Sequence, residues 1–106
     1  MLFGFNANMQ YLLANLFKAT LENFGMSEDY WETNRRSRSR EIIFFKQIFC
    51  FTAIEMGYSI EEAGKLMHMR RTTVVKYAEE LKSRMGAEGT KKAREVLNVT
   101  QKSDNT

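Results

Sequence analysis

The chain has 106 residues, which is enough for one domain. Of these residues 43% are hydrophobic, so the domain can bury a core without disulfides or a structural metal. A single cysteine, Cys50, excludes an internal disulfide and a cysteine metal cluster, and is consistent with the reducing cytoplasm where we expect the protein to act. The formal net charge of +3 is unevenly spread. Residues 1–34 carry one Lys/Arg against four Asp/Glu, a net −3, whereas residues 35–106 carry fifteen against nine, a net +6.

The first predicted element is an amphipathic helix that Gly25 ends. No basic leader precedes it, and no apolar run reaches the roughly 18 residues of a membrane helix, so we expect neither a signal peptide nor a membrane span. We interpret its apolar stripe as core. The alternative is a homodimer seam, or a groove for a partner protein. The stripe has residues three or four positions apart: Met9, Leu12, Leu13, Leu16, Phe17, Leu21 and Phe24.

An arginine-rich stretch follows a short helical turn. Ser27 is placed to cap that turn, and Trp31 within it is expected to fill the gap between the first helix and the next. Four arginines then occur within six residues, separated by serines, so the stretch cannot be core. It is either a solvated linker or a basic loop that contacts phosphates, and we favour the loop because guanidinium and hydroxyl groups are good phosphate donors. The arginines are Arg35, Arg36, Arg38 and Arg40.

Residues 41–56 are apolar nearly all round, which predicts a helix in the middle of the domain that ends at Gly57. Lys46 and Gln47 are the exceptions, and we expect both to emerge beside the arginine-rich loop. A strand over the same residues agrees with their propensities, but the patterns that follow are all helical.

The segment from Tyr58 to Met85 predicts two helices joined by a sharp turn, His68 to Arg70. Ser59 and Glu62 form a capping box that starts the first helix. Gly64 permits a close crossing, and Met69 is expected to point inward. Val74 and Tyr77 are expected to pack the second helix against the first. The apolar positions are Ile60, Ala63, Leu66 and Met67 in the first helix, and Val74, Ala78, Leu81 and Met85 in the second.

The second helix of this pair begins with polar and cationic residues on its outward side. A short helix, a turn and a second helix with a cationic start are typical of a DNA-binding helix-turn-helix, whose second helix presents its N-terminal end to base edges. Arginine suits guanine, and the threonine methyl suits thymine. The alternative is a helical hairpin with a solvated charged face. The outward residues are Arg70, Arg71, Thr72, Thr73 and Lys76.

The last predicted helix spans residues 90–99, after a break at Gly86 and Gly89, with Ala93, Val96 and Leu97 inward and Lys91, Lys92 and Arg94 outward. We expect a single helical domain over residues 1–99, a helix-turn-helix at about 59–85 and a disordered tail at 100–106. The sequence has no phosphate-binding glycine loop, and His68 has no metal-ligand neighbours at a suitable spacing. We therefore expect no enzyme, no metal and no cofactor.

Residues about 8–97 resemble the C-terminal DNA-binding domain of DnaA, the bacterial chromosomal replication initiator. The resemblance rests on RSREIIFFKQI followed by YSIEEAGKLMHMRRTTVVKYAEEL, and on the order of leading helix, arginine-rich loop, buried helix and helical pair. It implies an all-helical fold with a helix-turn-helix like that of the Trp repressor. It also implies a base contact for Thr72, a phosphate contact for Thr73, and a minor-groove position for Lys46, where the family has an arginine.

The chain departs from this family in the turn, which is one residue shorter. Arg70 and Arg71 replace an aspartate and a histidine that precede the threonines in the family, so we do not expect the initiator's usual target site. His68 occupies a position that needs a positive φ, which histidine tolerates at a cost. The ATPase part of an initiator is missing, so we expect a stand-alone module.

The sequence thus predicts an all-α domain of about five to six helices that binds double-stranded DNA sequence-specifically, as a transcription or replication regulator. Arg70, Arg71 and Thr72 are expected to read the major groove with Lys76 in support, while Thr73 and the loop arginines hold phosphates. The rival hypothesis is a protein-interaction module, favoured by the apolar first helix and by Glu79-Glu80. A third is RNA binding through the arginine–serine loop, against which the lack of an exposed aromatic platform counts.

Overall fold

The computed structural model describes the backbone of residues 2–85, 91, 92 and 94–96, and the side chains of these residues from 13 onward except 84 and 85. Every element in this part of the chain is helical, so the predicted all-α class is confirmed, and the strand alternative for the central segment is wrong. The elements are α1 (Leu2–Phe24), α2 (Glu28–Asn34), α3 (Arg40–Glu55), α4 (Ile60–Met67), α5 (Arg71–Glu80) and a π-helical turn (Leu81–Met85).

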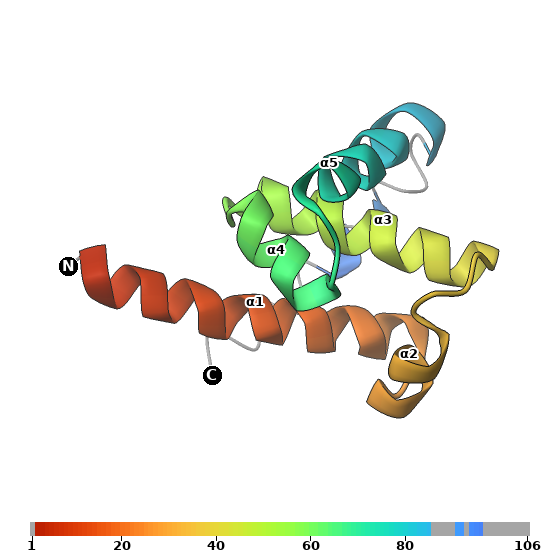
Figure 1. The fold of residues 1–106 in the computed structure, drawn as a ribbon, viewed down its shortest axis with the longest axis horizontal. Helices are drawn as coiled ribbons and strands as arrows, with labels where there is room; N and C mark the ends of the chain where they lie inside the picture. The colour runs from red at the N-terminus through yellow and green to blue at the C-terminus, as the bar shows by residue number, and fades with distance from the viewer. Residues whose placement is uncertain (1, 86–90, 93, 97–106) are drawn as a thin grey trace.

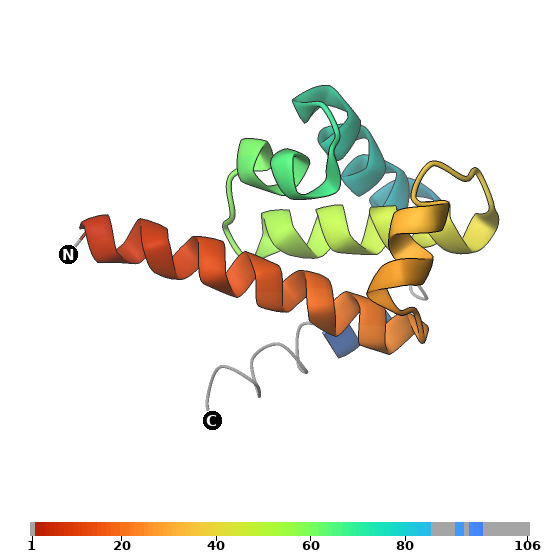
Figure 2. The ribbon, with the colours of Figure 1, turned by 60° about the horizontal axis from the view of Figure 1, so that its bottom comes forward.

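The helix α3 lies at the centre of the fold, with α1 along one side and the pair of α4 and α5 on the other (Figures 1 and 2). The short helix α2 covers one end of α1, and the arginine-rich loop returns the chain from α2 to the start of α3. The first turns of α1 extend past the other helices in both views. The near-continuous apolar surface of α3 explains its central position, because it has a neighbour to bury on each side.

Serine side chains cap the first turns of three helices, and each of these turns also holds at least one acidic residue. The hydroxyl oxygen accepts an N–H that the helix leaves unpaired, and the carboxylates favour the positive end of the helix dipole. The helix starts predicted at Ser27 and Ser59 are confirmed. Ser27 Oγ accepts from Tyr30 N at 3.0 Å, Ser39 Oγ from Ile42 N at 3.3 Å and Ser59 Oγ from Glu62 N at 3.0 Å.

Three helices end in the same hydrogen-bond pattern, with one residue in the left-handed region. That residue is Gly25 (φ 67°) after α1, Gly57 (φ 88°) after α3 and His68 (φ 58°) after α4. In each case the next N–H donates back to a carbonyl five residues earlier, which is the Schellman motif. The predicted glycine ends and the positive φ of His68 are confirmed. The bonds are Met26 N to Leu21 O (2.9 Å), Tyr58 N to Ala53 O (3.0 Å) and Met69 N to Gly64 O (2.8 Å).

Aromatic rings from three helices meet where α2 closes over α1 and α3. Trp31 of α2 is only 2% exposed, with ring centroids 5.7 Å from Phe17 of α1 and 4.5 Å from Phe45 of α3. The expectation that Trp31 fills the gap between the first and third helices is confirmed. Cys50 is fully buried in the same core, as expected, and burial raises the pKa of its thiol to about 12.

The expectation that Gln47 emerges beside the arginine-rich loop is wrong. Its side chain is 5% exposed, and its Nε2 donates to Glu80 Oε1 of α5 at 3.2 Å. Positions 46 and 47 are adjacent on a helix, so they face about 100° apart, and α5 covers the side that carries Gln47. Lys46 is half-buried, with its Nζ 5.9 Å from the ring centroid of Tyr77.

Other segments differ from the sequence-based expectation in extent or exposure. The helix α1 begins at Leu2, ahead of the stripe that starts at Met9, and α5 gives way to a π-helical turn, where Ser83 Oγ donates to Glu79 O at 3.0 Å. Lys92, which was expected to point outward, is half-buried, and its Nζ donates to Asn23 O at 3.4 Å. Val96 is buried as expected. The break at residues 86–90, the inward positions 93 and 97 and the tail lie outside the described residues.

Candidate nucleic-acid interface

The helices α4 and α5 are joined by the three residues that the sequence predicted for the turn, His68 to Arg70. Gly64 lies where α4 approaches this turn: a Cβ added to it would be 2.6 Å from Met69 O and 3.5 Å from Val74 Cγ2. Val74 is fully buried, and Met69 packs against the core. The close crossing at Gly64 and the inward direction of Met69 are therefore confirmed, and they fix the angle at which α5 leaves α4.

The N-terminal end of α5 presents its polar residues to solvent. Arg70, Arg71, Thr72 and Lys76 are exposed and Thr73 is half-buried, whereas Val74 and Ala78 face the core. Arg71 Nη1 lies 3.9 Å from Glu61 Oε1 of α4, with side chains 68% and 71% exposed, so this pair is a weak one. The five residues predicted for base and phosphate contacts thus share one accessible end of a helix.

The start of α5 differs from the starts of α2, α3 and α4. Its N-cap is Arg70, which makes no side-chain capping hydrogen bond, and no acidic residue stands in its first turn. The first N–H groups of a helix lack acceptors within the helix and carry the positive end of its dipole. Two arginines therefore lie where the fold alone favours an anion, and the site is suited to bind one.

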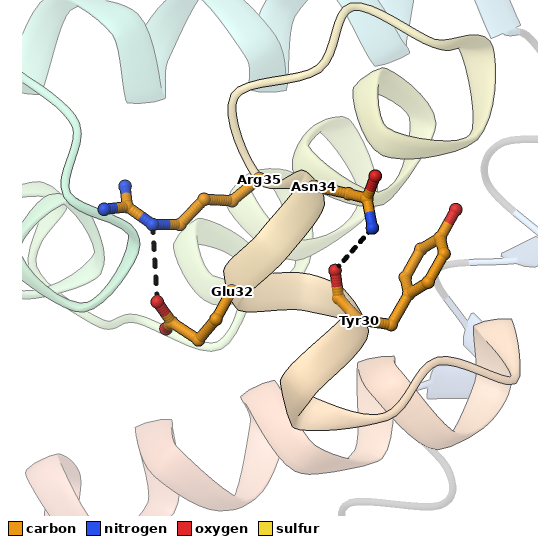
Figure 3. A network of polar contacts seen from close by, with 4 residues as sticks. All are labelled: Tyr30, Glu32, Asn34 and Arg35. Atoms are coloured by element: carbon orange, nitrogen blue, oxygen red, sulfur yellow. Dashed lines mark hydrogen bonds and ion pairs between the residues drawn. The ribbon is translucent and has the colours of Figure 1, made fainter.

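The base of the arginine-rich loop is fixed by local contacts (Figure 3). Arg35 Nε lies 3.5 Å from Glu32 Oε2, and Asn34 Nδ2 donates to Tyr30 O at 2.9 Å. Arg35 is half-buried, so it is the least accessible of the four predicted phosphate ligands. The other three arginines of the loop are exposed, and neither serine oxygen is idle: Ser37 Oγ accepts from Ser39 N at 3.1 Å, and Ser39 caps α3.

The loop charges act on residues of α3 and α5. The pKa of Lys46 is lowered, first by burial and to a smaller degree by repulsion from Arg35. The pKa of Tyr77 is raised, first by burial, with Arg38 acting in the opposite direction. The charges of Arg35 and Arg38 thus act on Lys46 and on Tyr77, and Tyr77 lies one helical turn after Thr73. Arg36, Arg38 and Arg40 are exposed and form no ion pair with any described residue.

Tyr77 was assigned only to packing, yet its half-buried ring lies beside Lys46 at the edge of this surface. Its spacing of four residues from Thr73 places both on one side of α5, and this spacing was visible in the sequence.

Among the described residues, Tyr30 is the one large hydrophobic side chain that is exposed, with 42% of its surface accessible. Its hydroxyl donates to Glu41 Oε1 at 3.2 Å, which raises the pKa of the tyrosine.

Within the described residues, no three His, Cys, Asp or Glu side chains gather in a way that could hold a metal ion. No helix in that part of the chain combines the length and apolarity of a bilayer-spanning segment.

Comparisons with family models, with curated proteins and with solved structures find no match to this chain. The resemblance to the initiator's DNA-binding domain stays a prediction.

Proposed function

We propose that this chain is a sequence-specific double-stranded DNA-binding protein whose α5 enters the major groove. The observation that carries the proposal is the start of α5, where Arg70, Arg71 and Thr72 are exposed at a helix terminus without a cap. An N-cap side chain is worth about 1 kcal/mol, and a cation near a helix N-terminus costs roughly 0.3–1 kcal/mol. DNA phosphates and guanine acceptors would supply the negative partners that the fold leaves out.

The remaining cations extend this surface. Thr73 and the exposed Arg36, Arg38 and Arg40 would hold phosphates, and Lys76 would support base reading from the second turn of α5. Lys46 would lie at the adjacent minor groove. A role in regulating transcription or replication follows from the resemblance to the initiator domain. The shorter turn and its arginines imply a target sequence other than the initiator's.

The test separates base reading from phosphate contact. Selection from a random duplex library yields the preferred site, and Arg71→Ala is then compared with Arg36→Ala on that site and on scrambled DNA. We expect Arg71→Ala to reduce discrimination by about 1–3 kcal/mol at one position, and Arg36→Ala to weaken both duplexes alike. Equal loss of discrimination in the two variants would refute this division of roles, and the absence of any selected site would refute the function.

A protein-interaction module is the second candidate, and the extension of α1 past the other helices favours it (Figures 1 and 2). The first 17 residues contain no charged side chain. The acidic pair of α5 supports this candidate less than the sequence indicated, because Glu80 accepts a hydrogen bond from buried Gln47. This candidate expects partner binding that is insensitive to salt, with no affinity for DNA.

A further inference from the structure

A pocket of about 670 Å³ lies between the end of α1 and the start of α3, on residues that the proposed function uses only in part. Its apolar lining comes from Phe24, Ile43 and Phe44, and the rings of Phe24 and Phe44 meet edge to face with centroids 5.5 Å apart. A volume of roughly 300–1,000 Å³ with an apolar lining and few polar groups is usual for a small-molecule site.

The charges around this pocket are mostly positive. Arg38, Arg40 and Lys92 line it, against one carboxylate, Glu41, which already accepts a hydrogen bond from Tyr30. Neither Arg38 nor Arg40 forms an ion pair with any residue that the structure describes. A ligand with one anionic group is therefore complementary to the mouth, because a guanidinium group binds a carboxylate through charge-assisted hydrogen bonds.

Two further polar residues, Asn23 and Lys92, line the pocket. The Oδ1 of Asn23 is buried without a hydrogen-bond donor in the described part of the chain. A buried acceptor without a donor is uncommon in folded proteins, and a carboxylate, which only accepts hydrogen bonds, does not supply the missing donor. Lys92 Nζ is held 5.0 Å from the ring centroid of Phe24 and 3.4 Å from Asn23 O, so one cation of the pocket is already in place.

We propose that this pocket binds a small soluble carboxylate with an apolar, ring-containing body. The body would lie against Phe24, Ile43 and Phe44, and the carboxylate would pair with Arg38 and Arg40. The same two guanidinium groups belong to the surface assigned above to DNA phosphates. Resting on the proposed function, the ligand competes with DNA for these arginines, and its binding lowers DNA affinity.

The test uses 2-naphthylacetate as the probe and its neutral amide as the matched control, with binding measured by calorimetry in the absence of DNA. We expect the carboxylate to bind about tenfold more tightly than the amide. Arg40→Gln is expected to weaken carboxylate binding about fivefold or more, whereas Arg36→Gln, on the same loop but outside the pocket lining, leaves it unchanged. Both variants are surface changes, and circular dichroism verifies that they fold.

Three results would overturn the proposal: equal affinity for carboxylate and amide, equal weakening by the two variants, or no binding of the probe at all. The DNA readout is separate. Probe binding in a protein without DNA affinity supports the pocket and refutes the proposed function. DNA affinity unchanged at saturating probe overturns the competition, because Arg38 and Arg40 would then not be shared.

Discussion

Gly64 fixes how closely α4 approaches the turn that leads into α5. A Cβ at this position would be 2.6 Å from the backbone oxygen of Met69, a distance that real side chains do not reach. Gly25 provides a matched comparison, because a Cβ there meets no atom within 4 Å, but its φ of +67° disfavours any side chain. The two glycines are thus needed for different reasons, one for space and one for backbone conformation.

Gly64→Ala is expected to lower the free energy of unfolding by about 2–4 kcal/mol, because the turn backbone must move to admit the methyl group. Gly25→Ala, which meets only a conformational cost, is expected to lose about 1 kcal/mol. Urea denaturation followed by circular dichroism measures both values. A smaller loss for Gly64→Ala than for Gly25→Ala would contradict the close crossing of α4 and the turn.

Cys50 is expected to be unreactive in the folded protein. Burial raises the pKa of its thiol from 9.0 to about 12, so at about pH 8 the thiolate is about 1000-fold less populated than in the unfolded chain. We expect a chromogenic disulfide reagent to react slowly with native protein, and rapidly in guanidinium chloride. Equal rates in the two conditions would show that Cys50 is accessible. Because the folded protein holds this proton more tightly than the unfolded chain, the raised pKa contributes to the free energy of unfolding below pH 9. This contribution is lost as the pH rises toward 12.

Single residues also show what the sequence could and could not reveal. The positive φ of His68 was expected from the resemblance to the initiator family, since His68 lies in the turn that this family shares. The burial of Gln47 was not, because it depends on α5 covering that side of α3 and on Glu80, 33 positions away, accepting its hydrogen bond. Local patterns contain no information on such a distant partner.

Among the helices α2 to α5, α5 is the one whose start lacks the local features that stabilise a helix terminus. The helices α2, α3 and α4 each combine a serine cap with acidic residues in the first turn, and α5 has neither. A natural sequence is generally consistent from local preference to fold, and exceptions tend to mark functional positions. The uncapped start of α5 therefore supports a binding role for this terminus.

Arg70→Ser tests this interpretation by giving α5 a cap. We expect the free energy of unfolding to rise by about 1 kcal/mol while DNA affinity falls, since a base or phosphate contact is lost with the guanidinium group. Ser59→Ala is the matched control: it removes the cap of α4, lowers stability by about 1 kcal/mol and leaves DNA affinity unchanged. Unchanged DNA affinity in Arg70→Ser would remove Arg70 from the proposed interface.

The element boundaries were predictable wherever a cap or a glycine marks them. The ends of α1 and α3 follow from Gly25 and Gly57, and the starts of α2 and α4 follow from Ser27 and Ser59. The start of α1 at Leu2 and the π-helical turn after Glu80 have no comparable marker. Ser83 donates to a carbonyl four residues earlier, a bond that perturbs a helix, but the sequence does not show that the serine makes this bond.

At the scale of the whole molecule, the layers of the fold determine which residues can act together. The helix α3 lies between α1 and α5, whereas α4 contacts both α1 and α3, and the arginine-rich loop joins α2 to the start of α3 (Figure 2). The sequence indicated the all-α class and the exposed cations. It did not indicate the pocket, because Lys92 and Asn23 are 69 positions apart and meet only through the tertiary fold.

The most direct test of a DNA-binding surface is a fluorescence-anisotropy titration with random-sequence duplex DNA at about 50 and 200 mM salt. If about five of the exposed cations contact phosphates, affinity should fall roughly 10²- to 10³-fold between these two conditions, since bound phosphates release their counterions. Binding that weakens to this extent is the result we predict. No binding at the lower salt concentration, or an affinity that salt leaves unchanged, would contradict the proposed function and favour a protein partner on α1.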